Sequence, residues 1–228
     1  PHSPSQNLDA GTVAGVAPLG VPISAQLQTT PQVAIDFSAP AATRTLLAQC
    51  VARKIAMVIG TTGLTADDQK AIDDAAKSIA ILQATNTGVG VNVLLGLVAQ
   101  AARQLGDAYD IEIIEAHHNL KKDAPSGTAL SLAEAAATAT GRDVDSALVH
   151  GRQGHDALRK KGTIGMHAVR MGDVVGEHTV YLTTSGERIE LRHVATNRDT
   201  FARGALRAAA FVARKTPGRY TMRDVLGL

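Results

Sequence analysis

Short apolar segments alternate with amphipathic segments after residue 31. Residues 32–37, 55–59 and 79–84 are rich in Ile, Val and Ala and have the length of buried strands, whereas residues 41–53 and 65–78 space their apolar side chains as helices do. Strands that alternate with helices in this way form parallel sheets with right-handed crossovers. This alternation constrains the fold more than any other feature, and it predicts an α/β domain.

A different pattern begins at residue 163, where apolar and polar side chains alternate with a period of two. This pattern predicts strands over residues 163–170, 174–184 and 187–195, joined by glycine-containing turns. An apolar strand over residues 109–114 precedes them. Such strands favour antiparallel or mixed pairing, with helices on one face. We therefore expect a second, α+β domain with an open mixed sheet.

Longer helical segments and two irregular stretches complete the chain. We predict helices over residues 88–105, 129–140 and 197–214, and the Ala/Leu content of the last suits packing back on the first domain. Residues 150–162 are rich in glycine and charge and predict a loop. Residues 1–31 lack apolar periodicity, so we expect an extended surface connection.

Composition excludes several classes of protein. With 45% hydrophobic and 3% aromatic residues and no Trp, the core must consist of Ala, Val, Ile and Leu. The net charge of +2, without basic residues interleaved with aromatics, argues against nucleic-acid binding. No apolar run is long enough for a membrane span, and no signal-peptide pattern opens the chain. The single Cys50 cannot form an internal disulfide, and we expect a reducing, cytoplasmic location.

Three loops follow the carboxyl ends of the predicted parallel strands. They comprise residues 37–40, 60–63 and 84–87. Each alone is more often an ordinary connection between a strand and a helix. Ligands of such sheets bind at this edge, however, and three loops at one edge favour a ligand site.

The glycine pattern that normally opens a dinucleotide-binding fold is absent from this sequence. Gly11, Gly15 and Gly20 have no strand before them, and the first predicted strand corresponds to the third of such a fold. We therefore predict an incomplete Rossmann-like sheet whose pyrophosphate-binding turn lies upstream of residue 1. Dinucleotides are then expected to bind this chain weakly.

The segment EAHHNLKKDAPSGTA, residues 115–129, carries the densest chemistry of the chain. It lies between a predicted strand and a predicted helix. Pro125 fits just before or at the first helical turn, and Ser126 or Thr128 can cap the helix. Free backbone N–H groups at Gly127 and Thr128 then form an anion-binding site. A carboxylate or phosphate could bind there while His117 and a lysine exchange protons with the ligand.

Other interpretations of this segment are weaker. The two histidines could be solvated loop residues. A metal site from Glu115, His117 and His118 is disfavoured, because alternation places His118 on the other side of the chain, and we predict no metal. Lys122 is interpreted as a solvated charge and Asp123 as a residue that orients the loop or a lysine.

The same segment closely resembles the signature of the dihydrodipicolinate reductase family, and the resemblance extends along nearly the whole chain. Further matching motifs are DFSxP at 36–40, GTTG at 60–63, Asn86 with GVGVN at 88–92, GTIG at 162–165, Arg170 with Gly172 and Asp173, GEH at 176–178, and residues 198–201. The resemblance implies reduction of the dehydrated form of 4-hydroxy-tetrahydrodipicolinate to tetrahydrodipicolinate by NADH or NADPH, in lysine and diaminopimelate biosynthesis.

The resemblance also implies roles for individual residues. His117 and Lys121 would be the catalytic acid/base pair, and His118, Gly127 and Thr128 would bind the dicarboxylate substrate. The cofactor-binding residues would be Phe37, Gly60, Thr61, Thr62, Ala84, Thr85, Asn86, Thr87, Arg198 and Phe201. Arg198 could instead only cap the last helix.

The family further implies a domain division and an assembly. Residues 1–88 and 198–228 would form the nucleotide-binding domain, and residues 89–197 a substrate-binding domain that builds a homotetramer through its sheet. The alternative from a different class is a truncated, catalytically inactive module that binds dicarboxylates and assembles but does not hold the nucleotide.

Overall fold

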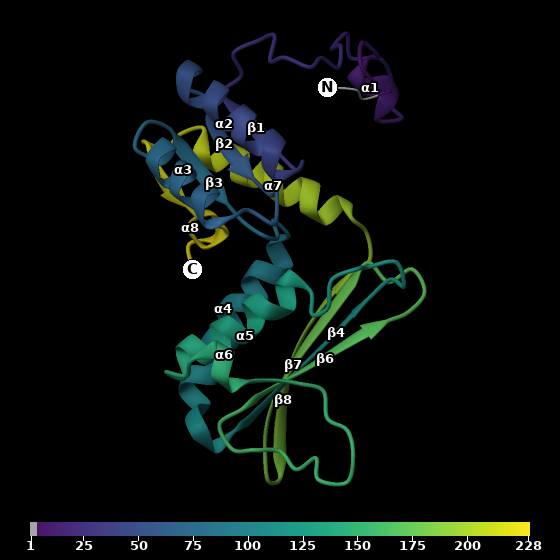
Figure 1. Ribbon diagram of the computed structural model, residues 1–228, viewed down its shortest axis with the longest axis vertical. Coiled ribbons are helices and arrows are strands. Elements are labelled where there is room, and N and C mark those ends of the chain that lie inside the picture. The colour runs from purple at the N-terminus through teal and green to yellow at the C-terminus, as the bar shows by residue number, and fades with distance from the viewer. Residues whose placement is uncertain (1–3) are drawn as a thin grey trace.

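The computed structural model describes residues 4–228, which form two sheets, each with its own helices (Figure 1). The first sheet lies at one end of the elongated molecule, together with the C-terminal helices. The second sheet lies at the other end, with α4 and α5 beside it. Among the described residues, no helix has the length and apolar content needed to span a membrane.

The first sheet is parallel throughout and has the order β1-β2-β3-β9. Its strands are β1 (Val33–Asp36), β2 (Ala56–Ile59), β3 (Ala80–Gln83) and β9 (Gly218–Tyr220). Because side chains alternate along a strand, Met57 and Ile59 pack against α2 and α3, while Val58 packs against α7. Helices on both faces confirm the predicted α/β class.

Three helices cover this sheet. On one face lie α2 (Pro40–Arg53) and α3 (Ala66–Ala76), and on the other lies α7 (Asp199–Val212). Helix α7 contacts β1, β2 and β3, so the last long helix packs back on the first sheet, as its composition predicted.

The second sheet is mixed, in the order β5-β6-β4-β7-β8. Its strands are β5 (Leu148–His150), β6 (Ile164–Arg170), β4 (Asp110–His117), β7 (Gly176–Thr184) and β8 (Glu187–Ala195). The first three strands in this order run parallel, and β7 and β8 are antiparallel to their neighbours. Helices α4 (Val89–Leu105) and α5 (Gly127–Ala139) pack on one face, where Ile111, Ile113 and Leu132 are fully buried.

Several predicted boundaries differ from the structure by one to three residues, and two of them affect the segment of residues 115–129, called here the reactive segment. Strand β4 continues to His117 rather than ending at residue 114, because it pairs with β6 as far as Arg170 and with β7 as far as Glu177. Helix α5 begins at Gly127 rather than at residue 129. His117 is therefore held by a sheet, and Gly127 belongs to a helix.

Several short elements escaped prediction because three to five residues carry too little periodicity. They are α1 (Ala10–Val13), the 3-10 helix η1 (Gly106–Ala108), α6 (Val144–Ala147), β5, β9 and α8 (Met222–Leu226). The predicted surface connection over residues 1–31 is largely exposed where it is described, with α1 and one bridge between Asp9 and Pro22. Its first three residues lie outside the described part of the chain.

Candidate functional site

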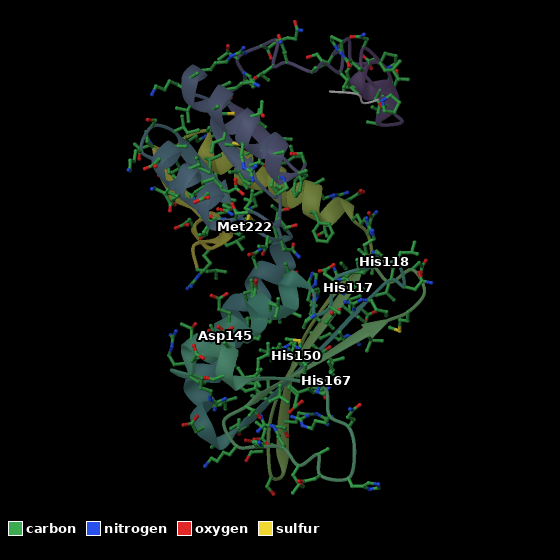
Figure 2. All side chains as sticks on the ribbon, viewed as in Figure 1. His117, His118, Asp145, His150, His167 and Met222 are labelled. Carbon is green, nitrogen blue, oxygen red and sulfur yellow. The ribbon has the colours of Figure 1, made fainter. Side chains whose placement is uncertain are left out.

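A cavity of about 540 Å³ lies where the carboxyl ends of β1, β2 and β3 face the end of β4. His117 and His118 lie at the end of the mixed sheet that is nearer the first sheet (Figure 2). Loops from the first sheet supply one side of the cavity, and the segment after β4 with the start of α5 supplies the other. The residues that line it are Phe37, Gly60, Thr62, Thr85, Asn86, Thr87, His117, His118, Lys121, Asp123, Ser126, Gly127, Thr128, Val175, Arg198 and Phe201.

Eight of the ten residues predicted to bind the cofactor line this cavity, and two do not. Thr61 is buried; its Oγ1 donates to Asp36 Oδ2 at 3.0 Å and accepts from the Ser38 N–H at 3.0 Å. It therefore joins the loops after β1 and β2 to each other. Ala84 lines a neighbouring cavity instead. The cofactor contacts of all ten residues stay predictions.

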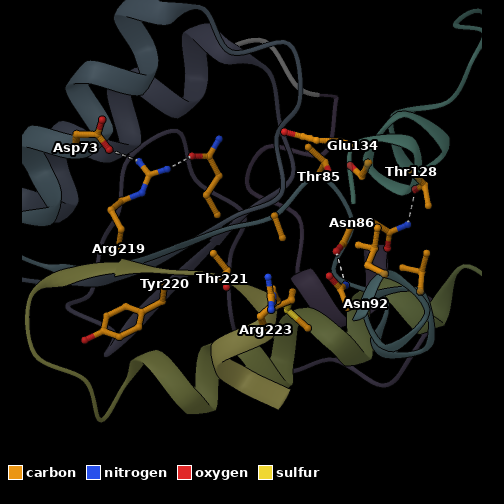
Figure 3. Close-up of a pocket in the computed structure, with 16 residues that line it drawn as sticks. Asp73, Thr85, Asn86, Asn92, Thr128, Glu134, Arg219, Tyr220, Thr221 and Arg223 are labelled. Atoms are coloured by element: carbon orange, nitrogen blue, oxygen red, sulfur yellow. Dashed lines mark hydrogen bonds and ion pairs between the residues drawn. The ribbon is translucent and has the colours of Figure 1, made fainter. Parts of the chain in front are cut away.

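The neighbouring cavity, of about 790 Å³, is the larger of the two (Figure 3). It shares Thr85, Asn86 and Thr128 with the first cavity. Between the two cavities, Asn86 Nδ2 donates to Thr128 Oγ1 at 3.0 Å, as the dashed line in Figure 3 shows. This hydrogen bond connects a loop of the first sheet to a helix of the second.

The first turn of α5 has the geometry of an anion-binding site. Ser126 is the N-cap and accepts a hydrogen bond from the Ala129 N–H at 3.2 Å, so Ser126 rather than Thr128 caps the helix. A Cβ atom added at Gly127 would meet no atom within 4 Å. Neither packing nor a positive φ angle therefore requires glycine at this position. The missing side chain leaves open space in the cavity beside free N–H groups.

A buried carboxylate organises the other half of the site. Glu115 is fully buried, and its Oε2 lies 2.5 Å from His117 Nδ1. Arg170 donates to both carboxylate oxygens at 2.9 Å, and the Ser126 N–H donates to Oε1 at 3.0 Å. Sequence reasoning considered Glu115 only as a metal ligand and gave Arg170 no role. The signal in the sequence that could have indicated a role for Arg170 was its place among the motifs that match the family.

The charge state of this cluster follows from its contacts. Burial opposes ionisation of Glu115, but hydrogen bonds from Arg170 and His117 outweigh it, and the net effect lowers the pKa of Glu115. Burial lowers the pKa of His117, and the charges of Lys121 and Arg170 act in the same direction, while Glu115 opposes them. The carboxylate therefore stays charged and supports the protonated form of His117.

The remaining residues of the segment take positions close to those interpreted from sequence. Lys121 Nζ lies 2.9 Å from Asp123 Oδ1, so Asp123 holds the lysine, and Lys122 is exposed. Arg198 makes no side-chain cap to α7; its Nη2 lies 3.2 Å from His118 Nε2. Arg198 occupies the N-cap position of α7 without a side-chain capping hydrogen bond, and its contact with a phosphate stays a prediction.

His178 is a further buried histidine that sequence reasoning gave no role. Its ring lies 5.2 Å from that of His117 between centroids, and its Nε2 lies 3.2 Å from Ser126 Oγ. Burial, together with the nearby charge of His117, lowers the pKa of His178 to about 4. His178 is therefore neutral in the folded protein near pH 7.

The depressed pKa of His178 predicts a pH dependence of stability. An unfolded histidine takes up a proton below pH 6.5, whereas folded His178 takes one up only near pH 4. The unfolded state thus binds more protons in this window, and the free energy of unfolding falls by about 3 kcal/mol as pH drops across it. Urea titrations at several pH values measure this slope. We expect His178→Gln to flatten it, and an equal slope in that variant would contradict the assignment.

Comparison with known proteins decides which family this site belongs to. The family models described as "Dihydrodipicolinate reductase, N-terminus" and "Dihydrodipicolinate reductase, C-terminus" match residues 1–87 and 90–226. The chain belongs to the dihydrodipicolinate reductase family. The 4-hydroxy-tetrahydrodipicolinate reductase of Halorhodospira halophila is 49% identical over 223 residues, which are 96% of this chain and 84% of that protein. The enzyme of the same name from Acinetobacter baumannii is 49% identical over 232 residues, or 100% of this chain and 85% of that protein.

One solved structure agrees with the membership in the reductase family, and another shares the fold. The dipicolinate-bound dihydrodipicolinate reductase of Paenisporosarcina sp. TG-14 superimposes with a TM-score of 0.71 at 25% identity, covering 90% of this chain and 79% of that one. A probable dehydrogenase from Thermotoga maritima shares the fold, with a TM-score of 0.53 at 12% identity over 87% of this chain and 74% of that one. The predicted family and its oxidoreductase class are confirmed, and no finding supports the inactive-module alternative.

Proposed function

We propose that this chain reduces the dehydrated form of 4-hydroxy-tetrahydrodipicolinate to tetrahydrodipicolinate, with NADH or NADPH as the reductant. The observation that carries the proposal is a single cavity. It brings together the predicted acid/base pair, the predicted substrate-binding residues and most of the predicted cofactor loops. The relatives that are 49% identical to this chain carry the name of that reductase, which agrees with this arrangement.

The residues on the side of the first sheet fit a nicotinamide ring. Gly60 has no side chain, and a Cβ atom there would lie 2.2 Å from the Phe37 ring, so only glycine permits this packing of Phe37. Thr62, Thr85 and Asn86 add hydroxyl and amide groups to the same side of the cavity, where they can contact the nicotinamide. When bound, the nicotinamide supplies the hydride for the reduction of the substrate imine.

The side of the second sheet supplies charge and protons. The N–H groups of Gly127 and Thr128 and the ammonium of Lys121 bind carboxylate, since charge-assisted hydrogen bonds and a helix N-terminus both favour anions. Lys121 and His117 stand four residues apart on the same cavity wall and hold the protons that the reduced product needs. Arg198 and His118 add donors at the rim.

The anion-binding site makes a direct prediction. Pyridine-2,6-dicarboxylate should bind in the cavity and shift the amide resonances of Gly127 and Thr128, and added salt should weaken it, because part of the site is solvent-exposed. Gly127→Val fills the open space and should reduce affinity by ~10-fold or more. Gly96→Ala is a control, because a Cβ there makes an ordinary contact with Leu228 at 3.5 Å. Salt-independent binding, or an unaffected Gly127→Val variant, would count against this placement.

Turnover tests the proposed function itself. Freshly prepared 4-hydroxy-tetrahydrodipicolinate should cause oxidation of NADH or NADPH by the purified chain, with competitive inhibition by pyridine-2,6-dicarboxylate. A preparation that binds a nicotinamide cofactor and pyridine-2,6-dicarboxylate, but oxidises neither NADH nor NADPH in the presence of substrate, would refute the proposal.

The proposal includes the domain roles and a homotetramer. The parallel sheet with α7 and β9 supports a nucleotide-binding unit of residues 1–88 and 198–228, and the mixed sheet supports a substrate unit of residues 89–197. The face of the mixed sheet opposite α4 and α5 carries the half-exposed Ile114, Val169 and Val194, which favours burial against another copy. Light scattering that finds a monomer at micromolar concentration would exclude the tetramer.

A further inference from the structure

Glu115 is the buried group that contacts both halves of the reactive segment. It accepts hydrogen bonds from the His117 ring on its own strand, from Arg170 on β6 and from the backbone of Ser126 at the helix cap. Arg170 also donates to the Asp123 carbonyl oxygen at 2.6 Å. The pair Glu115–Arg170 thus fixes the end of β4, the loop after it and the start of α5 relative to one another.

The charge of Glu115 determines which nitrogen of His117 carries a proton. An ionised carboxylate can only accept hydrogen bonds, so the nitrogen that faces it, Nδ1, must be the donor. In the neutral ring this leaves Nε2 without a proton. Nε2 is therefore the atom that can take up a proton and return it.

The surroundings of Nε2 are consistent with this assignment. Gly176, the first residue of β7, faces this nitrogen, and a Cβ atom added there would lie 3.1 Å from it. The φ angle of Gly176 lies outside the left-handed region, so the backbone does not require glycine. Glycine instead keeps a side chain away from the proton-exchanging atom.

We propose that Glu115, held by Arg170, is a positioning residue of the reduction: it fixes the ring orientation and tautomer of His117 so that Nε2 exchanges the proton. Glu115 lines no part of the cavity and acts through His117. The charged and titratable groups around the ring are Glu115 on the same strand, Lys121 in the loop, Arg170 on β6 and His178 on β7. The kinetic part of this inference rests on the proposed function, whereas the tautomer does not.

The wild-type protein provides the first test. Nitrogen-15 NMR of the imidazole rings, with His117 assigned through a His117→Gln variant, should show the neutral Nδ1–H tautomer. The Nε2–H tautomer would overturn the proposal. This measurement needs neither turnover nor a folded Glu115 variant, so it separates a failure of this inference from a failure of the proposed function.

Kinetics of Glu115→Gln provide the second test. Its matched control is Glu112→Gln. Glu112 lies on the same strand and is likewise bound by Arg152, by Arg159 and by His167 at 2.7 Å, but His167, unlike His117, does not line the cavity. We expect Glu115→Gln to lower kcat by ~10²-fold and to shift the pH profile of kcat to lower pH, because the neighbouring positive charges then act on His117 unopposed. Affinity for pyridine-2,6-dicarboxylate should change by less than about 3-fold.

Two outcomes would contradict the role of Glu115. One is a folded Glu115→Gln variant with the kcat and pH profile of the wild type. The other is an equal loss of turnover and dicarboxylate affinity, which indicates a merely structural role.

Gly176→Ala tests the opposite side of the His117 ring. It should lower kcat while dicarboxylate binding persists, and wild-type kcat in that variant would contradict the assignment of Nε2.

Discussion

We expect alanine at His117 or at Lys121 to lower kcat by ~10²-fold or more, because each change removes a proposed proton-transfer group from the cavity. His117 is held by a sheet strand and by Glu115, and Lys121 is held by Asp123, so both side chains are oriented before substrate binds. Water can replace such groups only with the loss of their fixed geometry. Steady-state kinetics with saturating cofactor measure the effect.

The neighbouring lysine provides the control for this experiment. Lys122 is exposed and does not line the cavity, so Lys122→Ala should retain kcat within about 3-fold. Near-wild-type turnover in the Lys121 or His117 variant would remove that residue from the mechanism. A loss in Lys122→Ala as large as in Lys121→Ala would show that the effect reflects net charge rather than position.

Removal of Arg170 has the largest expected effect on stability. Its guanidinium makes a two-bond contact with Glu115, and the side chains are 19% and 0% exposed. Arg170→Ala leaves a buried carboxylate with His117 as its remaining side-chain partner, and loss of one member of a buried ion pair costs about 3–5 kcal/mol. Denaturant titration near pH 7 measures this loss.

A surface ion pair and a double variant test whether an unpaired buried charge causes this loss of stability. Arg192 and Glu177 are 57% and 27% exposed, so Arg192→Ala should cost less than about 1 kcal/mol. If the cost of Arg170→Ala comes from an unpaired buried charge, adding Glu115→Gln should restore part of the stability. Equal costs for Arg170→Ala and Arg192→Ala, or no recovery in the double variant, would show that Glu115 is not an unpaired buried charge in the Arg170 variant.

The fold could be predicted from sequence wherever an element was long enough to show its period. The strands at β1, β2 and β3 and the helices between them carry continuous local signals, and so do β7 and β8. By contrast, β9 has three residues and exists because it pairs with β3, more than a hundred residues earlier in the chain. No local pattern reports such a pairing.

The same contrast between local and long-range signals applies to the residues of the site. His117, Lys121 and the Gly127 helix start are close in sequence, so spacing and family resemblance identified them together. The role proposed for Glu115 could not be read from the local sequence, because its buried carboxylate pairs with Arg170, which lies 55 residues away. Long-range pairing with β6 and β7 likewise extends β4 through polar residues where the apolar alternation had already stopped. Thr61 and Ala84 were predicted to bind the cofactor from the family resemblance, but the direction of each side chain depends on packing.

We propose that a nicotinamide bound in this cavity transfers a hydride to a dicarboxylate imine. NADH and NADPH that carry deuterium at the transferable position of the nicotinamide ring, followed by mass spectrometry of the product, test this transfer. We expect tetrahydrodipicolinate with one deuterium, formed by the wild type and by Lys122→Ala and much more slowly by Lys121→Ala. Product without deuterium, or no product at saturating cofactor, would show that this hydride transfer does not take place.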